Sequence, residues 1–200
     1  RDKLVTGVQT CALPIYASDR KMNYVAFIRG INVGGHKKVA MRDLCLLLEN
    51  HGLEQVKTIL QTGNIIFSVE HGVPEALLEE QIASAIYQQL QLVVTVFVRQ
   101  KEFLEQTMHN NPFSEMAIAN PSHLLVMLLA KNPSLSALED LIKSIQGREQ
   151  ITAGSQCLYL TYPDGIGRSK LTHHLIEKKL GIQGTARNWT TIAKIHASMA

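Results

Sequence analysis

The chain has 200 residues, of which 46% are hydrophobic and 18% are charged. This composition excludes a wholly disordered chain and is sufficient for one large or two small hydrophobic cores. The formal net charge is +3, but residues 22–200 contain 16 basic and 15 acidic side chains and contribute only +1. Strong overall electrostatic attraction to nucleic acid is therefore excluded.

The longest apolar run, residues 124–130, is far shorter than the roughly 20 residues that a membrane-spanning helix requires. Cys11, Cys45 and Cys157 are widely spaced and odd in number, which gives neither a disulfide framework nor a zinc motif. We therefore expect a cytoplasmic protein with no membrane partner, no metal site and no cofactor. The sequence does not indicate an oligomeric state.

Residues 1–21 show no helical or strand periodicity, and a regular pattern begins at Met22. We interpret this leader as non-native or disordered, because it resembles translated adapter sequence ahead of reading frames from environmental sequencing. A signal peptide is the alternative. It is disfavoured because the segment does not begin with Met and because Pro14 interrupts its apolar stretch.

The first half, residues 22–109, alternates between strand and helix patterns. β-Forming runs predict strands, helical spacing of apolar residues predicts helices, and Pro74 is expected as the first residue of the second helix. The predicted order is strand 24–29, helix 41–50, strands 56–60 and 65–69, helix 74–90 and strand 93–99. This β-α-β-β-α-β order is that of a ferredoxin-like unit. A connecting helix over 101–108 follows, and Pro112 disfavours helix just before it.

The second half, residues 110–200, repeats this order without visible sequence identity. We expect strand 123–130, helix 134–145, strands 150–153 and 157–162, helix 169–180, a short strand 185–187 and a terminal helix 190–198. The predicted fold class is therefore α+β, with two ferredoxin-like units, mixed and mainly antiparallel sheets, and a C-terminal helix.

The most prominent candidate site is the glycine-rich basic loop that follows the first strand. Glycines allow backbone N–H groups to converge on a ligand, and neighbouring cations favour phosphate or carboxylate. The candidate residues are Arg29, Asn32, Gly34, Gly35 and Lys37. The spacing matches neither a Walker A loop nor a dinucleotide-binding fingerprint, and a plain connection that needs positive φ is the alternative.

A second candidate lies between two strands of the first half, where Gln61, Thr62 and Asn64 surround Gly63. Their side chains could orient a polar ligand or a base edge. A simple turn explains the segment equally well.

A third candidate is the glycine loop at 163–170. If the following helix starts at 169, then Arg168, Ser169 and Lys170 surround its N-terminus and could bind an anion. The alternative is a turn with Ser169 as an ordinary N-cap. If both glycine loops lie on one rim, a single charged ligand could span them.

The fourth candidate comprises Arg187, Asn188 and Trp189. Arg187 could hold a phosphate or carboxylate, and Trp189 could stack on a base. Alternatively, Trp189 anchors the last helix while Asn188 or Thr190 caps it. The adjacent His173 and His174 are interpreted as a solvated face, since adjacent helical residues cannot jointly hold a metal.

These four segments together resemble the bacterial protein family DUF1697. The likeness covers residues 22–200 and rests on four motifs: Phe27 to Gly35, Gln61 to Asn64, Gly165 to Leu171 and Ala186 to Thr191. Thr62 departs from the serine that the family commonly has, but the hydroxyl is retained. The resemblance implies an α+β fold with ferredoxin-like units, and it implies no catalytic residue because the activity of the family is not established.

The leading functional expectation is a protein that binds a phosphate-bearing small molecule or a nucleic acid through its glycine-rich basic loops. The sequence leaves two alternatives open. One is an enzyme acting on a small phosphorylated or carboxylated metabolite, with Arg29 and Arg168 as anion clamps and His36 or Asn64 assisting. The other is a structural or protein-interaction module.

Overall fold

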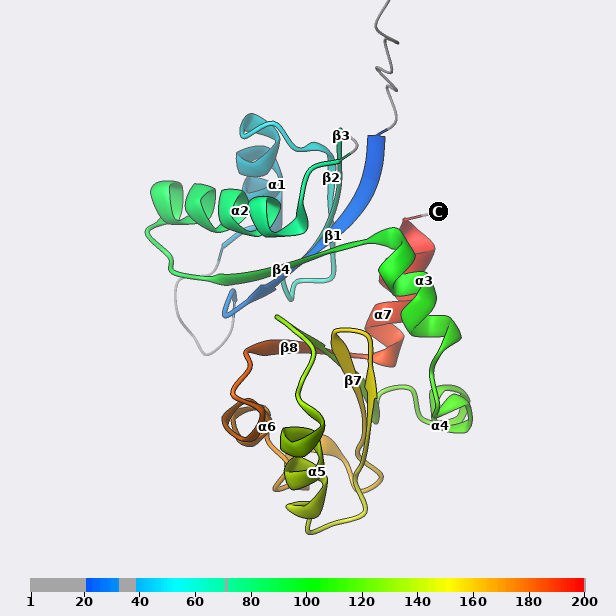
Figure 1. Ribbon diagram of the computed structural model, residues 1–200. Coiled ribbons are helices and arrows are strands. Elements are labelled where there is room, and N and C mark those ends of the chain that lie inside the picture. The colour runs from blue at the N-terminus through cyan, green and yellow to red at the C-terminus, as the bar shows by residue number, and fades with distance from the viewer. Residues whose placement is uncertain (1–20, 33–38, 71, 200) are drawn as a thin grey trace, which may run out of the picture.

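The computed structural model describes residues 21–32, 39–70 and 72–199, and it shows two similar α+β halves joined end to end (Figure 1). The elements of the first half are β1 (Lys21–Arg29), α1 (Met41–Asn50), β2 (Glu54–Ile59), β3 (Asn64–Glu70), α2 (Glu75–Leu90) and β4 (Thr95–Gln100). The four strands form one sheet in the order β2-β3-β1-β4.

The second half contains β5 (Leu124–Leu129), α5 (Leu135–Lys143), β6 (Gln150–Gly154), β7 (Cys157–Thr161), α6 (His173–Leu180) and β8 (Gly184–Asn188). Its sheet order, β6-β7-β5-β8, repeats that of the first half. The halves are connected by α3 (Lys101–His109) and α4 (Ser114–Ala119), and the chain continues from β8 into α7 (Trp189–Ser198).

The predicted fold class is confirmed, with several differences at the boundaries. The strand pairs in both sheets are antiparallel throughout the described residues, so neither sheet is mixed. Lys21, assigned to the leader, belongs to β1 and pairs with Glu70. Pro74 precedes α2 as its N-cap residue instead of forming its first turn. The short helix α4 was not predicted because only a weak apolar pattern marks its six residues.

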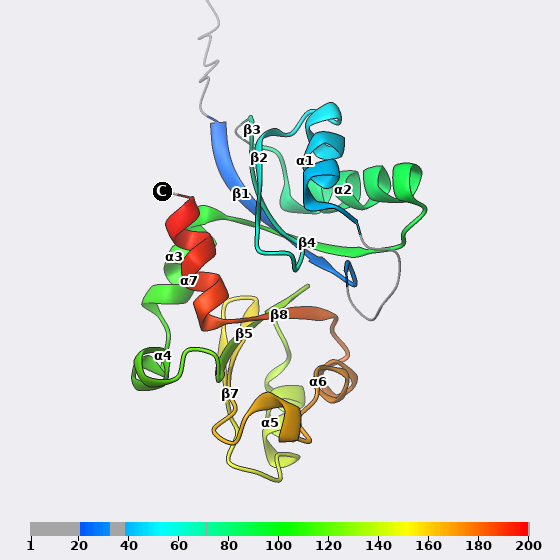
Figure 2. The ribbon, with the colours of Figure 1, turned by 180° about the vertical axis from the view of Figure 1, so that it is seen from behind.

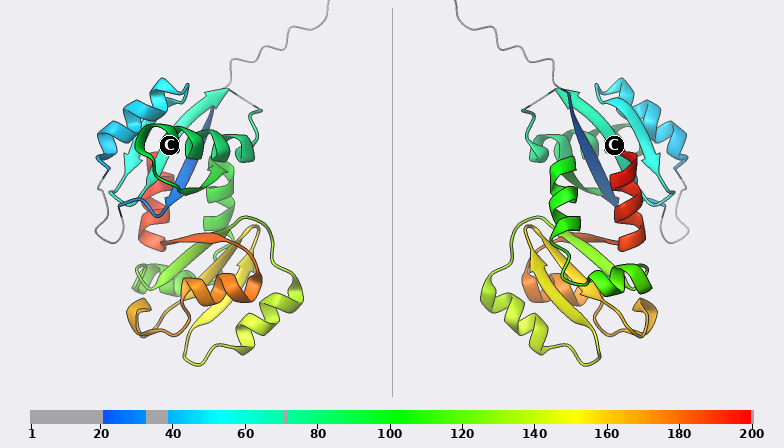
Figure 3. Two further views of the ribbon diagram at one scale, coloured as in Figure 1. Left: turned by 90° about the vertical axis from the view of Figure 1, so that its left-hand side faces the viewer. Right: turned by 90° about the vertical axis from the view of Figure 1, so that its right-hand side faces the viewer.

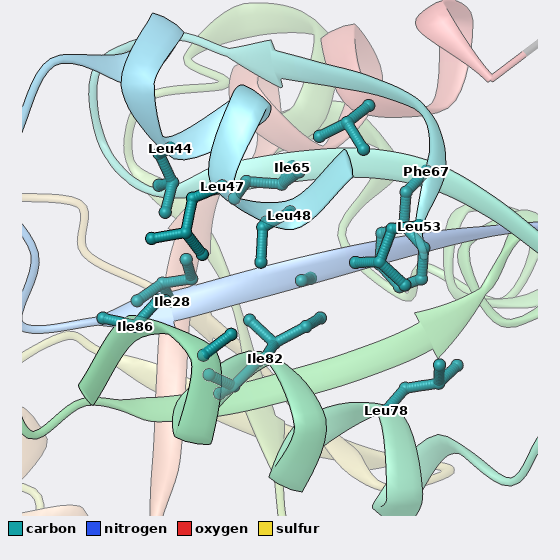
Figure 4. Close-up of a cluster of buried hydrophobic side chains, with 14 of the residues drawn as sticks. Ile28, Leu44, Leu47, Leu48, Leu53, Ile65, Phe67, Leu78, Ile82 and Ile86 are labelled. Atoms are coloured by element: carbon teal, nitrogen blue, oxygen red, sulfur yellow. The ribbon is translucent and has the colours of Figure 1, made fainter. Parts of the chain in front are cut away.

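Each half has its own hydrophobic core between its sheet and its two helices. In the first half, α1 contributes Leu44 and Leu48 at helical spacing, and α2 contributes Ile82 and Ile86 (Figure 4). The two helices cover the same face of the sheet (Figure 1). The alternating residues Tyr24, Ala26 and Ile28 of β1 point to this face.

The opposite, helix-free faces of the two sheets share a second core, which we call the junction core. It contains Val25 and Phe27 of β1, Val126 and Leu128 of β5, and apolar residues of α3 and α7. These two helices lie side by side at one edge of the junction (Figures 1 and 2). Because β1 and β5 are buried on both faces, both strands are near-continuous apolar runs.

The junction core excludes one mode of nucleic-acid binding. Ferredoxin-like sheets that bind RNA use aromatic side chains on their helix-free face. Here Phe27 and Phe97 lie on that face, in register with each other, and both are buried. In the side views, one half lies above the other (Figure 3). Within the described residues, none of the helices is long and apolar enough to cross a lipid bilayer.

Candidate functional site

A crevice of about 420 Å³ lies where the two halves meet at the C-terminal end of β1. Its walls come from the end of β1 and residues 30–32 after it, the turn between β2 and β3, the first turns of α6 and α7, and β8. The polar residues that line it include Arg29, Asn32, Thr62, His173, Arg187 and Asn188. Five of these six belong to the predicted site, and they come from three of its four segments.

Arg187 of β8 reaches across the junction to the first half. Its guanidinium uses five N–H donors, which is the full complement of an arginine side chain. The acceptors are Oδ1 of Asn64 at 2.5 Å, Oγ1 of Thr185 at 2.8 Å, and the carbonyl oxygens of Ala186, Ile28 and Thr62 at 2.9, 3.1 and 3.2 Å. The guanidinium also lies over the ring of Phe27, 5.7 Å from its centroid.

Every one of these acceptors is electrically neutral. No carboxylate among the described residues forms an ion pair with Arg187. Burial without a counterion disfavours the charged form and lowers the pKa of Arg187 to about 10. The crevice therefore contains a positive charge that nothing nearby in the described chain compensates.

Asn64 connects this guanidinium to the turn between β2 and β3. Its side chain is fully buried, and its amide nitrogen donates to the carbonyl oxygen of Ile59 at 3.0 Å and to Oγ1 of Thr62 at 3.1 Å. The predicted turn over 61–64 is thus present, with Asn64 as the first residue of β3. Gln61 is exposed and does not line the crevice.

Gly63 of this turn has φ of +73°, and its place requires glycine. A Cβ atom there would lie 2.6 Å from Cγ2 of Ile31 and 2.9 Å from the carbonyl oxygen of Ile28. The turn therefore packs directly against the end of β1.

Arg29, at the end of β1, forms a bidentate ion pair with Glu177 of α6, with Nη2 lying 3.1 Å from Oε2. Its Nη1 also donates to the carbonyl oxygen of Gly184 at 3.2 Å, and Glu177 accepts from the Gly184 amide at 2.8 Å. Burial opposes ionisation of Glu177, but the hydrogen bonds from Arg29 and Gly184 outweigh it and lower the pKa of this carboxyl. The Arg29 side chain remains 42% exposed, so its charge is accessible from the crevice.

Asn32 closes the base of the glycine-rich loop. Its Nδ2 donates to the carbonyl oxygen of Val39 at 3.0 Å, and its Oδ1 accepts from the Val39 amide at 2.8 Å. Asn32 has φ of +55°, a conformation that asparagine tolerates better than most residues. Gly34, Gly35 and Lys37 of the predicted site lie outside the described residues.

His173, the first residue of α6, was not predicted to be part of the site. It is exposed, as expected, but it lines the crevice. Partial desolvation lowers the pKa of His173, the nearby charge of Glu177 raises it, and the charges of Arg29 and Arg187 lower it further. Glu177 was also missed, since no motif marks either residue. Only the packing of α6 against the end of β1 brings His173 to the crevice and Glu177 to Arg29.

The expected N-terminal site around Arg168, Ser169 and Lys170 is not formed. The helix α6 starts at His173, and Thr172 caps it by accepting from the amide of Leu175 at 3.2 Å. Residues 166–168 instead form a short 3-10 turn. Ser169 is therefore not an N-cap. Its hydroxyl donates to Glu149 and accepts from the amide of Leu171 at 3.0 Å.

The two glycine loops do not share one rim. Arg168, Ser169 and Lys170 line a separate pocket inside the second half, and Arg29 lines the crevice. The hypothesis of a single ligand spanning Arg29 and Arg168 is therefore wrong. The predicted repeat of the fold is present, but the two basic loops occupy different surroundings within it.

For the fourth candidate segment, the structure confirms the alternative in which Asn188 caps the last helix. Oδ1 of Asn188 accepts from the backbone amide of Thr191 at 2.9 Å and from its hydroxyl at 2.7 Å, so Asn188 is the N-cap. Trp189 is half-buried and packs against the junction core. Asn188 also lines the crevice, whereas Trp189 does not.

Arg99 of β4 is the counterpart of Arg187 in the repeated fold. Arg99 pairs with Val25 of β1, and Arg187 pairs with Val126 of β5, the equivalent strand. Nη2 of Arg99 donates to the carbonyl oxygen of Leu129 at 2.7 Å, three residues beyond Val126. Nη2 of Arg187 correspondingly donates to the carbonyl oxygen three residues beyond Val25.

The two arginines differ in their counterions. Nη1 of Arg99 lies 3.2 Å from Oε1 of Glu79 and 3.4 Å from Oε2 of Glu75, both on α2. Arg187 has Asn64 and Thr185 as its side-chain partners instead. The charge is thus neutralised at one end of the junction and left uncompensated at the other, beside the crevice.

No group of His, Cys, Asp and Glu side chains suited to a metal ion occurs in the described part of the chain. The site is therefore characterised by cations, hydroxyls and amides. Such groups bind anions and polar ligands through charge-assisted hydrogen bonds.

The comparisons with known proteins concern the family and the fold. No protein of curated function matches the chain. A bacterial protein of solved structure, SP0830 from Streptococcus pneumoniae, is 21% identical and superposes with a TM-score of 0.71 over 90% of this chain and 100% of its own. At this identity the likeness shows the fold alone. A structure described as a putative chlorite dismutase, TA0507, covers 90% of this chain and 99% of its own at 12% identity, but its TM-score of 0.26 supports no argument.

The sequence profile of DUF1697 matches residues 22–159, which is more than half of the chain. The match begins at Met22, immediately after the predicted leader. The chain therefore belongs to the DUF1697 family, whose members are described as proteins of unknown function.

Proposed function

We propose that the protein binds a small phosphate-bearing ligand in the crevice between its two halves. The observation that carries this proposal is the uncompensated charge of Arg187 beside a cavity, at a position whose counterpart, Arg99, has two glutamates. A charge removed from water is costly unless an opposite charge accompanies it. An anion in the crevice would supply the counterion that the chain itself does not.

Arg187 supplies the central charge of the proposed site, but other side chains would contact the ligand. The N–H donors of Arg187 are already used, so its contribution is long-range attraction in a partly desolvated site. Arg29 keeps an accessible guanidinium, and the hydroxyl of Thr62 can donate to a phosphate oxygen. His173 would add a further charge by taking up a proton when an anion binds nearby.

The size of the crevice supports the same assignment, because a cavity of about 420 Å³ falls within the range of small-molecule sites.

A small ligand is favoured over a nucleic acid for two reasons. The net charge of residues 22–200 is only +1, so a nucleic acid would find little attraction outside the crevice. The helix-free sheet faces that could stack bases are buried in the junction core. A phosphate group entering the crevice needs neither feature.

The test is isothermal titration of the purified chain with inorganic phosphate and with pyrophosphate. The decisive variant is Asn64→Asp, which keeps the acceptor for Arg187 and places a carboxylate beside it. The variant also loses the two hydrogen bonds that the Asn64 amide donates to Ile59 and Thr62, so its folding must be verified. We expect at least about a tenfold loss of affinity, because the ligand is no longer the missing counterion. Arg29→Gln should weaken binding by removing a direct contact.

Two matched controls separate this effect from a general change of charge. Asn132→Asp makes the same substitution outside the crevice and keeps the acceptor for the amide of Gln156. Lys194→Gln removes an exposed cation on α7 that lines neither pocket. Unchanged affinity in Asn64→Asp, with folding verified by circular dichroism, would overturn the proposal. Tighter binding of a single-stranded oligonucleotide than of pyrophosphate would favour a nucleic acid instead.

A further inference from the structure

The second pocket, defined by Arg168, Ser169 and Lys170 together with the end of α5, has a volume of about 330 Å³. It lies wholly within the second half and shares no lining residue with the crevice. Its floor and walls come from residues 144–149, the segment 162–171 and Leu175 of α6. Its chemistry is different from that of the crevice.

Two cations at this pocket form no ion pair with a carboxylate of the described chain. The Arg168 side chain is exposed and forms neither a hydrogen bond nor an ion pair with any described residue. After the hydrogen bond from Arg148, the charge of Arg168 helps to lower the pKa of the Asp164 carboxyl. Lys170 donates only to the neutral Oε1 of Gln146, at 3.1 Å. Asp164 also lines the pocket, but its carboxylate is engaged by Arg148, with Nε 3.0 Å from Oδ2. Both cations are therefore available to an incoming carboxylate.

A carboxylate with incomplete hydrogen bonding lines the same pocket. Oε1 of Glu149 accepts from the hydroxyl of Ser169, whereas Oε2 is buried and has no hydrogen-bond partner among the described residues. Gly147 makes room for this oxygen, since a Cβ at Gly147 would lie only 2.2 Å from it. A buried acceptor without a donor is costly, and a ligand that donates a hydrogen bond would remove that cost.

One wall of the pocket is apolar. Ile145, Leu171 and Leu175 contribute aliphatic surface, and Tyr162 contributes its ring. The hydroxyl of Tyr162 donates to the carbonyl oxygen of Leu171 at 3.0 Å. Burial, together with the charge of Glu149, raises the pKa of Tyr162 to about 12, so this side chain stays neutral at physiological pH. The wall thus offers apolar contact and no further charge.

We infer that this pocket binds a free α-amino acid with an aliphatic side chain. Its ammonium group would donate to Glu149, its carboxylate would be held by Arg168 and Lys170, and its side chain would contact the apolar wall. Two cations outside any ion pair and a carboxylate oxygen without a hydrogen-bond partner, around one small cavity, match a zwitterion better than a simple anion. The inference is independent of the phosphate ligand proposed for the crevice.

The test is calorimetric titration with L-leucine and two analogues that each lack one charged group. The analogue 4-methylpentanoate lacks the ammonium group, and 3-methylbutylamine lacks the carboxylate. We expect leucine to bind and each analogue to bind at least about tenfold more weakly, because one charge-assisted contact is lost. If 4-methylpentanoate binds as tightly as leucine, the role of Glu149 is refuted. If none of the twenty common amino acids binds, the inference is overturned.

Variants assign the site and separate it from the crevice. Glu149→Gln keeps an acceptor for Ser169 while removing the charge, and Arg168→Gln alters an exposed side chain that forms no side-chain hydrogen bond with any described residue. Each should weaken leucine binding about tenfold or more, whereas Lys194→Gln should not. Leucine binding should persist in Asn64→Asp, and phosphate binding should persist in Arg168→Gln. Undiminished leucine affinity in both Glu149→Gln and Arg168→Gln would refute the assignment even if the phosphate proposal holds.

Discussion

Arg99 and Arg187 occupy equivalent positions in the two sheets, and each donates across the junction to a carbonyl oxygen at the end of the other half's first strand. The distances are 2.7 Å to Leu129 and 3.1 Å to Ile28. These paired bonds explain how two small sheets remain joined around a shared core. The two arginines can be compared directly, because Arg99 has carboxylate partners and Arg187, at the equivalent position, has only neutral ones.

The amide clamp between Asn32 and Val39 should contribute to the stability of the fold. Asn32→Ala removes both hydrogen bonds to Val39 and places alanine at φ of +55°, whereas Asn32→Gly removes only the hydrogen bonds. We expect losses of unfolding free energy of about 2–3 kcal/mol for alanine and about 1–2 kcal/mol for glycine. Urea denaturation measures both, and faster hydrogen exchange at the Val39 amide locates the effect. Equal losses in the two variants would contradict the role of the backbone conformation.

His173 should make stability depend on pH in a defined direction. The pKa of His173 is lower in the folded chain than its ordinary value of 6.5, so the folded state binds fewer protons than the unfolded state between the two values. Its contribution to stability is therefore present above pH 6.5 and is lost as the pH falls toward the folded pKa. Urea unfolding between pH 5 and 8 should show a steeper acid loss for the wild type than for His173→Gln.

The same histidine reports on the crevice. Pyrophosphate bound next to the ring would favour its charged form, so saturating pyrophosphate should raise the pKa of His173 in an NMR titration of the ring protons. His174, which does not line the crevice, is the internal control. A larger pKa change at His174 than at His173 would place the ligand elsewhere.

Two neighbouring substitutions should show where α6 begins. Thr172→Ala removes the N-cap and should cost about 1 kcal/mol of unfolding free energy, with faster exchange of the Leu175 amide. Ser169→Ala removes a hydrogen bond to Glu149 and should leave the Leu175 amide unaffected. Faster exchange of that amide in Ser169→Ala would instead support a helix that begins at 169.

Cys157 should be inert in the folded protein. It is buried in the junction core, and burial raises the pKa of its thiol to about 11. Thiolate is the reactive form, so reaction with a disulfide reagent at pH 8 should be much slower than in urea. A Cys11→Ser/Cys45→Ser background isolates this thiol. Rapid native reaction would show that the junction core opens readily.

Several features followed from the sequence because they depend on local patterns. Apolar periodicity located α1 and α2 and the strands, and the doubled β-α-β-β-α-β order gave both sheets. Helix ends were less certain. The start of α6 was misplaced because Ser169 and Thr172 are both acceptable caps, and only the loop's contact with Glu149 chooses between them.

The candidate site shows where local patterns stop being informative. The sequence by itself determined which polar residues lie at the ends of strands and helices and are therefore site candidates, among them Arg29, Asn32, Thr62, Arg187 and Asn188. Only the tertiary structure decided that they meet, that Arg168 does not join them, and that His173 and Glu177 do. The physical reason is that each half folds around its own core through local periodicity, whereas their mutual placement depends on the junction core and on the carbonyls that Arg99 and Arg187 reach.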